Sequence, residues 1–312
     1  MGKNLSAVLT LTLTVLLIGL TACKKSEPSN DVPQALLPDS YEYPSDVPSD
    51  SVITEPESVV GQPKQDLSSL KQFKYSWTDS DDIPPVIVIV DDFGYSGGSL
   101  LQGFAELPRE IVFAILPDLP FTARSAQIAA ETGRDAIIHV PMEAAGAKIS
   151  PGKRYLKSGQ DEQTVKDMLD SFITQIPKAI AANNHMGSTA TSNRELMTTV
   201  LNHLNDKGLY FVDSVTTGST VGYNLAHTLG YKSIRRNIFL DVPDNSDATL
   251  AQRISDLGRY KGRKEPVIII THCHNQSKLD ALKKFLKQID EMGVQLTSLS
   301  RYYGSMALAA NQ

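Results

Sequence analysis

The most constraining feature of this sequence is an unbroken apolar run that ends in two carboxylates. Residues 86–90 are five β-branched aliphatic side chains, and Asp91 and Asp92 follow them directly. Such a run indicates a strand buried on both faces, as in parallel sheets, whose carboxyl ends open into ligand-binding loops. Adjacent carboxylates repel each other, so they stay close together only where a cation, a proton or water offsets the repulsion. A helix N-cap or a turn pair at the strand exit is the alternative interpretation.

Strand-like and helix-like runs alternate from Pro84 onward. The strand-like runs are 86–90, 111–116, 135–140, a weaker one ending near Asn184, 209–212, 233–240, 267–271 and, as an eighth candidate, 294–299. Helical runs separate them at 99–107, 122–132, 161–182 with a kink or division at Pro177, 192–207, 219–229, 247–260 and 277–292. This alternation implies right-handed crossovers and a largely parallel sheet. We predict a (β/α) barrel rather than a doubly wound sheet, because residues 94–98 have neither the dinucleotide spacing nor a P-loop lysine.

Polar residues that suit a metal site follow most of these strands. They are Asp91 and Asp92 after the first strand, His139 after the third, His185 after the fourth, Asp213 after the fifth, Asp241 after the sixth, and His272 and His274 after the seventh. Four of the six histidines therefore fall at one end of the predicted sheet, while His203 and His227 lie inside predicted helices as surface or packing residues. A single histidine at a strand end is more often a structural hydrogen-bonding residue. The convergence of aspartate oxygens and histidine nitrogens instead indicates Zn²⁺ or a similar divalent ion.

Several motifs, taken in their order along the chain, resemble the divergent polysaccharide deacetylase family. They comprise residues 88–96, 139–143, 184–188, 211–214 and 236–241, and the resemblance extends over about Pro84 to Leu299. That family is distantly similar to the carbohydrate esterases that remove N-acetyl groups from chitin-like and peptidoglycan sugars. The resemblance implies a deformed (β/α) barrel of about seven parallel strands and one divalent metal ion, expected to be Zn²⁺.

The resemblance also implies roles for individual residues. Asp91 resembles the general base of the esterases, and Asp92 resembles a metal ligand. His139 resembles the first histidine ligand, and His272 resembles the general acid. These assignments place the predicted chemistry at the carboxyl ends of the predicted strands.

The third metal ligand is where the sequence departs from the better-studied esterases, which carry a second histidine four residues after the first. That position is Glu143 in this chain. Either Glu143 is the third ligand, or His185 from the next strand end takes its place. We favour His185, because zinc sites commonly use several imidazoles and a histidine at a strand end can point inward.

The sequence offers two histidines as candidates for the general acid. The chain has Thr-His-Cys around His272 where relatives tend to have Gly-His-Pro, so His272 and His274 are both candidates. A nearby carboxylate, such as Asp241 or Asp213, is expected to keep His272 protonated. Arg236 either orients one of these carboxylates or closes the barrel rim through a salt bridge.

The N-terminus resembles the signal of bacterial lipoproteins. Lys3 precedes an apolar stretch over residues 5–20, and Leu-Thr-Ala leads into Cys23 as in a lipobox. We expect residues 1–22 to be removed and Cys23 to be lipidated, which would anchor the protein to a membrane. The alternative is an ordinary secretory signal with an incidental cysteine. The resemblance to lipoproteins also implies that Lys24, rather than an aspartate, after the cysteine favours the outer membrane facing the periplasm if the source is Gram-negative.

The remainder of the chain divides by composition. Residues 23–82 are rich in serine, proline and acidic side chains and are expected to form a disordered tether. We expect residues 83–304 to form the deacetylase-like domain and residues 305–312 a C-terminal tail. Cys23 and Cys273 are the two cysteines, so lipidation of Cys23 leaves no partner for an intramolecular disulfide.

Charge and resemblance together narrow the function. A formal net charge of −5 and the lack of long basic clusters argue against a nucleic-acid-binding surface. The resemblance implies an envelope-anchored, metal-dependent hydrolase that deacetylates N-acetylated sugars of a polysaccharide or peptidoglycan. A catalytically decayed scaffold that binds glycan or protein in the envelope is one alternative, and Glu143 is the departure that favours it. A different metal-dependent hydrolase, acting on a peptide or a phosphoester, is the other. No protein partner is indicated.

Overall fold

The computed structural model describes residues 82–310, and the side chains of residues 82–304. The predicted signal peptide, Cys23 and all but the last residue of the predicted tether lie outside the described residues. Among the residues that are described, no helix combines the length and the apolar character needed to cross a membrane.

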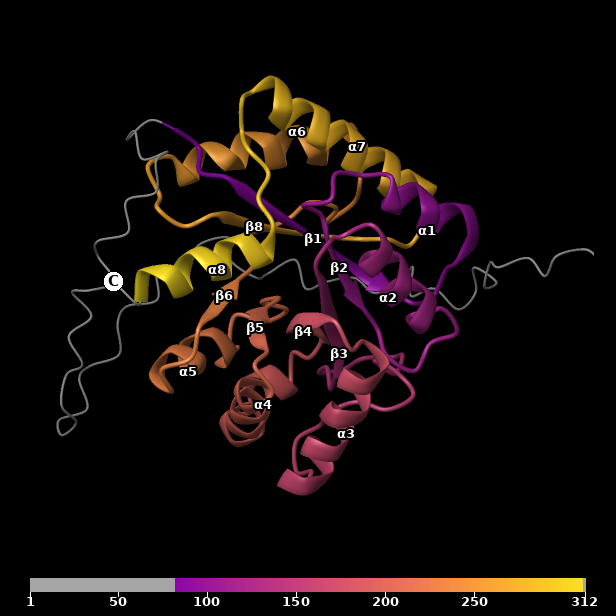
Figure 1. The fold of residues 1–312 in the computed structure, drawn as a ribbon, viewed down its shortest axis with the longest axis vertical. Coiled ribbons are helices and arrows are strands. Elements are labelled where there is room, and N and C mark those ends of the chain that lie inside the picture. Colours follow the sequence, from indigo (N-terminus) through magenta and orange to yellow (C-terminus); the bar gives the residue numbers. More distant parts are fainter. Residues whose placement is uncertain (1–81, 311–312) are drawn as a thin grey trace, which may run out of the picture.

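Parallel strands form one sheet at the centre of the molecule, and helices surround it (Figure 1). The strands are β1 (Val86–Phe93), β2 (Val112–Ile115), β3 (Ala136–Met142), β4 (Ala179–Met186), β5 (Tyr210–Asp213), β6 (Ser233–Arg235), β7 (Ile238–Phe239) and β8 (Val267–His272). The helices are α1 (Gly98–Ala105), α2 (Thr122–Glu131), α3 (Glu162–Gln175), α4 (Arg194–Asp206), α5 (Gly222–Thr228), α6 (Asp247–Asp256), α7 (Gln276–Glu291) and α8 (Leu299–Ala310), with short 3₁₀ helices η3 (Ala190–Ser192) and η4 (Leu257–Tyr260). The strand order is β6-β5-β4-β3-β2-β1-β8-β7.

The two edge strands of this sheet, β6 and β7, are consecutive in the chain and separated only by Arg236 and Asn237. β6 pairs with β5, whereas β7 pairs with β8 at the opposite edge. The Arg236 N–H donates to the Asp213 carbonyl (2.9 Å), and the Asn237 N–H donates to the Ile268 carbonyl (2.8 Å). The strand predicted at 233–240 is therefore split, and its halves bring the two edges of the sheet together. This confirms the deformed (β/α) barrel, with β6 and β7 as two parts of one barrel strand.

Side chains alternate between the barrel interior and the surrounding helices along each strand. On β1, Ile87 and Ile89 face the interior, whereas Val88 and Val90 pack with the residues of the helices. The interior cluster from the strands consists of apolar and mostly branched side chains, namely Ile87, Ile89, Val112, Ala114, Ile137, Ala181, Val212, Ile234, Ile268 and Ile270. The lower part of the barrel is thus a packed core.

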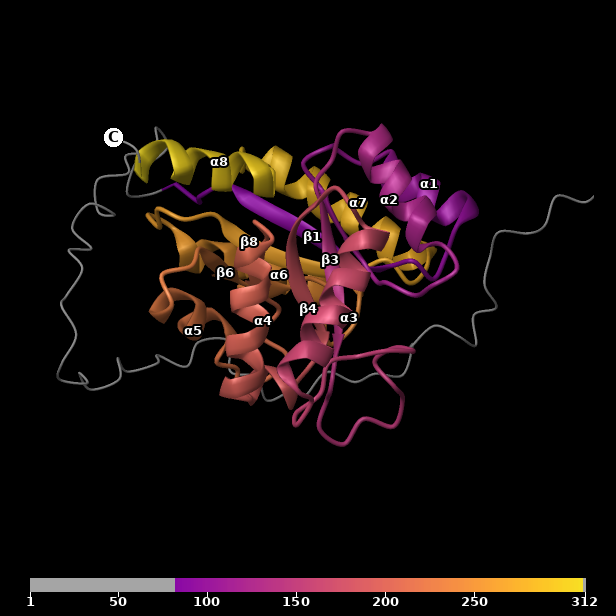
Figure 2. The same cartoon turned by 60° about the horizontal axis from the view of Figure 1, so that its bottom comes forward.

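Helix α8 covers the amino end of this interior. Residues 295–297, which immediately precede the helix, pair with Val86 at the amino end of β1. Leu299, Tyr302 and Tyr303 belong to the interior cluster, and Tyr303 stacks on Tyr210 with ring centroids 3.7 Å apart. Figure 2 shows α8 at one end of the barrel and the long loop between β3 and α3 at the other. The polar residues at the carboxyl ends of the strands therefore lie away from α8.

The structure also differs from the sequence analysis around β4 and around α8. The helix predicted over 161–182 ends at Gln175, because Pro177 cannot continue a helix, and β4 begins shortly after it. The eighth strand predicted at 294–299 makes a single bridge to β1, and the chain then turns into α8. That helix also includes residues 305–310, which the sequence analysis placed in a C-terminal tail.

Candidate metal and catalytic site

Two adjacent aspartates reach the same site because β1 is irregular at its carboxyl end. Asp91 continues the inward-facing series of β1 and lies opposite His272 of β8. The register between β1 and β2 then shifts between Val90 and Phe93, and Asp92 adopts a left-handed backbone conformation with φ of 71°. Adjacent side chains of a regular strand point to opposite faces, so this irregularity turns Asp92 toward the site that Asp91 also reaches.

Three ligand atoms from three strands meet beside these aspartates. Asp92 Oδ1 lies 3.2 Å from His139 Nε2 and 3.0 Å from His185 Nδ1, and the two imidazole nitrogens are 3.1 Å apart. The edge of a tetrahedral zinc site with ordinary bond lengths is about 3.3 Å. All three residues are buried, and Asp92 Oδ1 has no well-aligned hydrogen bond among the described residues. A divalent cation fits this group, because it would satisfy a buried carboxylate oxygen that the described donors leave unpaired.

Burial and neighbouring charges drive the pKa values of the two aspartates apart. Burial raises the pKa of Asp91, and the negative charge of Asp92 raises it further against the pull of nearby histidines. Burial also acts to raise the pKa of Asp92, but His185 and His139 outweigh this and hold it well below its usual range. Asp92 is therefore ionised, as a metal ligand must be, whereas Asp91 is the more basic of the two.

The two imidazoles of the group differ in the same way. Burial lowers the pKa of His185, which favours the neutral ring that a metal requires. Burial acts to lower the pKa of His139 as well, but Asp91 and Asp92 outweigh it and raise this pKa. The carboxylates beside His139 thus attract positive charge, and a bound cation can supply it in place of a proton.

His272 belongs to a second polar group at the same end of the barrel. His272 Nδ1 lies 3.1 Å and 3.0 Å from the two carboxylate oxygens of Asp241. The Lys278 ammonium donates to Asp241 Oδ2 (2.7 Å). Burial acts to lower the pKa of His272, but the charge of Asp241 outweighs it and raises this pKa. The arrangement favours a protonated imidazole, which a general acid needs.

His274 is placed differently from His272. His274 Nε2 lies 2.5 Å from Asp92 Oδ2, the carboxylate oxygen that is not part of the three-atom group. The two histidines therefore contact different aspartates, and only His272 is held by Asp241 in the contacts described above. His274 is suited to orient Asp92, as residues behind a metal ligand commonly do.

Glu143 lies apart from the three-atom group. β3 ends at Met142, and the Glu143 N–H donates to the Leu156 carbonyl (2.8 Å) in the loop that follows. The Glu143 carboxylate accepts from the Ser158 N–H (3.0 Å). The side chain is therefore committed to the β3–α3 loop in this structure, whereas His185 remains within β4 and reaches Asp92.

Asp213 and Arg236 serve the barrel rim. Asp213 Oδ2 accepts from the Thr220 hydroxyl (2.8 Å) and from the Tyr223 N–H (3.0 Å), on the side where α5 packs. Of the two carboxylates that the sequence left open as partners of His272, Asp241 lies 3.0 Å from His272 Nδ1. Arg236 donates to the carbonyls of the residues that follow β5, with distances of 2.7 Å and 2.8 Å. It also lies over the Phe239 ring, 3.7 Å from the centroid.

The sequence analysis did not single out two residues of the site, Asn183 and Lys278. Asn183 contacts both Asp91 and His139. It lies two residues before His185 on β4, so the two-residue period of a strand could have identified it. Lys278 belongs to the first turn of α7, and no local pattern indicates that it reaches the site.

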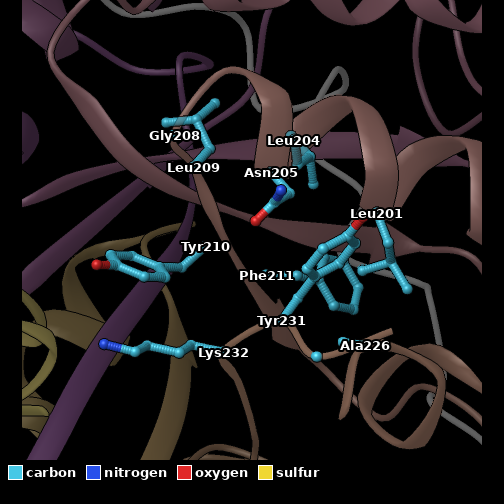
Figure 3. A pocket seen from close by; sticks show the side chains of 11 residues that line it. Leu201, Leu204, Asn205, Gly208, Leu209, Tyr210, Phe211, Ala226, Tyr231 and Lys232 are labelled. Atoms are coloured by element: carbon cyan, nitrogen blue, oxygen red, sulfur yellow. The ribbon is translucent and has the colours of Figure 1, made fainter. Parts of the chain in front are cut away.

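A cavity of about 330 Å³ lies elsewhere in the molecule, between the carboxyl ends of α4 and α5 (Figure 3). Leu201, Leu204 and Phe211 give it an apolar lining, and Tyr231 and Lys232 add polar groups. None of the candidate site residues lines it. The cavity is therefore separate from the group of polar side chains that forms the candidate site.

The comparisons with known proteins identify the family and support the fold. Residues 88–303 match the family described as divergent polysaccharide deacetylase, and the chain belongs to that family. An uncharacterized protein of Haemophilus influenzae is 33% identical over 217 residues, which cover 69% of this chain and 75% of that protein. The uncharacterized protein YibQ of Escherichia coli is 36% identical over 189 residues, which cover 60% of this chain and 58% of YibQ. The family expected from the sequence motifs is confirmed.

A crystal structure supports the fold as well. An uncharacterized protein of Agrobacterium tumefaciens superposes on this chain with a TM-score of 0.64 at 19% sequence identity. The similarity covers 70% of this chain and 88% of that protein. At this level of identity the likeness concerns the architecture of the barrel and not the chemistry of the site.

Proposed function

We propose that this protein is a metal-dependent deacetylase that hydrolyses N-acetyl groups of a polysaccharide or of peptidoglycan. The observation that carries the proposal is the meeting of Asp92 Oδ1, His139 Nε2 and His185 Nδ1 at mutual distances of 3.0–3.2 Å. Asp91 and His272 lie beside this group. Burial raises the pKa of Asp91, which makes this carboxylate a stronger base, and the charge of Asp241 raises the pKa of His272, which favours its protonated form. Family membership supports a carbohydrate substrate.

Asp92, His139 and His185 would hold the metal, which we propose to be Zn²⁺. Imidazole nitrogen and carboxylate oxygen are ligands that suit zinc, and three protein ligands leave a position open for chemistry. When bound, such an ion polarises the amide carbonyl and makes a water molecule acidic near neutral pH. One metal per chain is expected, because the described residues bring together one group of this kind.

The residues around the metal would divide the proton transfers between them. Asp91 accepts a proton from the attacking water as that water forms the new C–O bond to the acetamido carbon. The C–N bond then breaks, and His272 donates a proton to the departing amine nitrogen. Asp241 and Lys278 hold the His272 ring in place. The products are the free amino sugar and acetic acid, which keeps the second water hydrogen and ionises to acetate. Return of the proton from Asp91 to His272 through solvent restores both groups, so atoms and protons balance.

The test combines metal content with product formation. The purified protein is analysed for bound metal by mass spectrometry and assayed for acetate release from N-acetylchitooligosaccharides and from peptidoglycan. We expect one zinc per chain and acetate release that a chelator abolishes and added zinc restores. A protein that retains no stoichiometric metal after gentle dialysis would refute the proposal and favour the decayed scaffold. Two metals per chain would favour phosphoester chemistry instead.

We propose further that the enzyme works in the cell envelope, anchored to a bacterial membrane through Cys23. The support is the sequence Leu-Thr-Ala-Cys ending at Cys23, which lies outside the described residues. Fractionation of cells that express the parent and the Cys23→Ser variant tests this. The parent should sediment with outer membranes and the variant should not, because one cysteine carries the acyl chains. Equal sedimentation of both would place the anchor elsewhere.

A further inference from the structure

We infer that Asn183 is a positioning residue that sets the orientation of the base Asp91 and the tautomer of the metal ligand His139 through one side-chain amide. The inference rests on the proposed function, since it assigns Asn183 a part in that chemistry. Asn183 has no exposed surface, and both ends of its amide are engaged. Its Oδ1 lies 2.8 Å from His139 Nδ1, and its Nδ2 lies 2.9 Å from Asp91 Oδ1.

Two oxygens orient the Asn183 amide, because its NH₂ group donates to Asp91 Oδ1 (2.9 Å) and to the Ser214 hydroxyl (3.2 Å). The amide oxygen then faces His139 Nδ1 and can only accept, so His139 must carry its proton on Nδ1. His139 Nε2, beside Asp92 and His185, is then the ring nitrogen left to bind a cation. The Asn183 amide thereby selects the imidazole tautomer of His139 that can bind a metal through Nε2.

The same amide also distinguishes the two oxygens of Asp91. Asp91 Oδ1 receives the N–H of Asn183, whereas Asp91 Oδ2 lies 3.7 Å from His139 Nε2, toward the metal group. We assign proton acceptance to Oδ2, because it is the oxygen on the side of the metal group, where the attacking water would be held. Asn183 Nδ2 also lies 3.2 Å from the Ser214 hydroxyl, which anchors the amide from β5.

The sheet register explains why Asn183 can do this and its neighbour cannot. Asn183 of β4 lies opposite His139 of β3, and its side chain enters the barrel. Asn184 is equally buried but faces the other way. Its Oδ1 accepts from the Ser214 N–H (2.9 Å), and its Nδ2 donates to the Met186 carbonyl (2.7 Å). Asn184 is therefore a matched control: a buried asparagine on the same strand with structural contacts only.

The experiment compares Asn183→Ala, Asn183→Asp and Asn184→Ala in the otherwise intact protein. Zn²⁺ affinity is measured by titration with the metal alone, and acetate release is resolved into kcat and KM. Protein labelled with ¹⁵N-histidine reports the His139 Nδ1–H proton by NMR, with and without zinc. Thermal unfolding of each variant separates a loss of stability from a loss of function.

Each variant has a distinct expected result. Asn183→Ala should lose the hydrogen-bonded Nδ1–H signal of His139 and weaken zinc binding about 10–100-fold, as removal of residues behind metal ligands typically does. Asn183→Asp keeps an acceptor for His139 but has no N–H for Asp91. It should therefore retain the signal and most of the zinc affinity while kcat falls and KM stays unchanged. Asn184→Ala should lower the melting temperature yet keep the signal, the zinc affinity and kcat.

Two outcomes would overturn the inference. One is an Asn183→Ala protein that keeps both the His139 Nδ1–H signal and the parental zinc affinity. The other is an Asn184→Ala protein that loses them to the same extent, which would make the effect one of general stability. Should Asn183→Ala fail to fold, the near-isosteric Asn183→Asp variant still decides through its split between zinc affinity and kcat. A parent that keeps the Nδ1–H signal but releases no acetate would refute the proposed function and the role of Asn183 toward a catalytic base, and would leave only its role toward His139 standing.

Discussion

The two ends of the barrel interior differ in what they bury. At the amino end, α8 inserts Tyr302 and Tyr303 into an apolar cluster, and Tyr303 stacks on Tyr210. At the carboxyl end, the buried side chains are carboxylates, imidazoles and an amide. Apolar burial stabilises the first end, whereas buried charges at the second are costly unless partners or a cation compensate them.

The transition between the two ends takes a single step along the strands. Ile89 of β1 lies opposite Ile270 of β8, and the next inward-facing pair is Asp91 opposite His272. The same alternation therefore supplies the packed core first and the reactive groups immediately after it. This barrel therefore places its apolar core and its candidate site at different depths along one axis, which would separate stability from chemistry as in parallel barrels generally. The predictions below test that separation, from the largest expected effect to the smallest.

The largest effect is expected from the metal ligands. Asp92→Ala, His139→Ala and His185→Ala should each abolish stoichiometric zinc binding, because each removes one of three ligands, while the domain stays folded. Zinc titration and circular dichroism measure the two properties. His227→Ala is the control, since that exposed histidine of α5 contacts only the Ser233 carbonyl in the described hydrogen bonds. Unfolding of all three ligand variants would show that the carboxyl end also carries the stability of the fold.

Asp91→Ala should separate binding from catalysis at the same end. Asp91 is a base and not a ligand in our assignment, so the variant should keep its zinc and lose about 10²–10⁴ in kcat. Metal analysis and acetate release on the same preparation provide the measurement. Loss of the zinc together with the activity would place Asp91 among the ligands.

The amino end should respond in the opposite way. Tyr303→Ala should lower the free energy of unfolding by about 3–5 kcal/mol, the cost typical of removing a large buried aromatic ring, without changing zinc affinity. Tyr303→Phe is the matched variant, because the Tyr303 hydroxyl is buried with no hydrogen-bond partner among the described residues. Removal of this hydroxyl should leave the free energy of unfolding unchanged or slightly higher. A change in zinc affinity in Tyr303→Ala would contradict the separation of the two ends.

The smallest effect is expected at Glu143. Glu143→Gln keeps an acceptor for the Ser158 N–H and removes only the charge, so zinc affinity should match that of the parent. This variant decides between the two candidate ligand sets. If Glu143→Gln strips the metal and His185→Ala does not, Glu143 is the third ligand and our assignment of His185 is wrong.

Much of the fold could be predicted from sequence because its signals are local. The apolar run at 86–90 and the alternation of strand and helix periods indicated a parallel barrel, and ordered motifs indicated the family. The strand at 233–240 was predicted as one element, yet it is split between two edges of the sheet. That split depends on the distance between β5 and β8 in the folded barrel, which cannot be predicted from a local sequence pattern.

The candidate site was predictable in composition but not in pairing. Asp213 and Asp241 both follow strands, yet only Asp241 contacts His272 in the hydrogen bonds described here. A shift of one residue at a strand end moves a side chain to the other face, so strand-end position alone cannot choose between them. Lys278 was missed because it comes from a helix.

The sequence by itself determined that a parallel barrel presents carboxylates and imidazoles at one end, since each apolar strand is followed directly in the chain by these polar residues. Only the tertiary structure decided which of them meet. The irregularity of β1 that turns Asp92 beside Asp91, and the register that sets Asn183 against His139, arise from pairing between separate strands. The positions of these side chains depend on such long-range contacts. The same local sequence patterns are compatible with several strand pairings, and only the folded structure selects one of them.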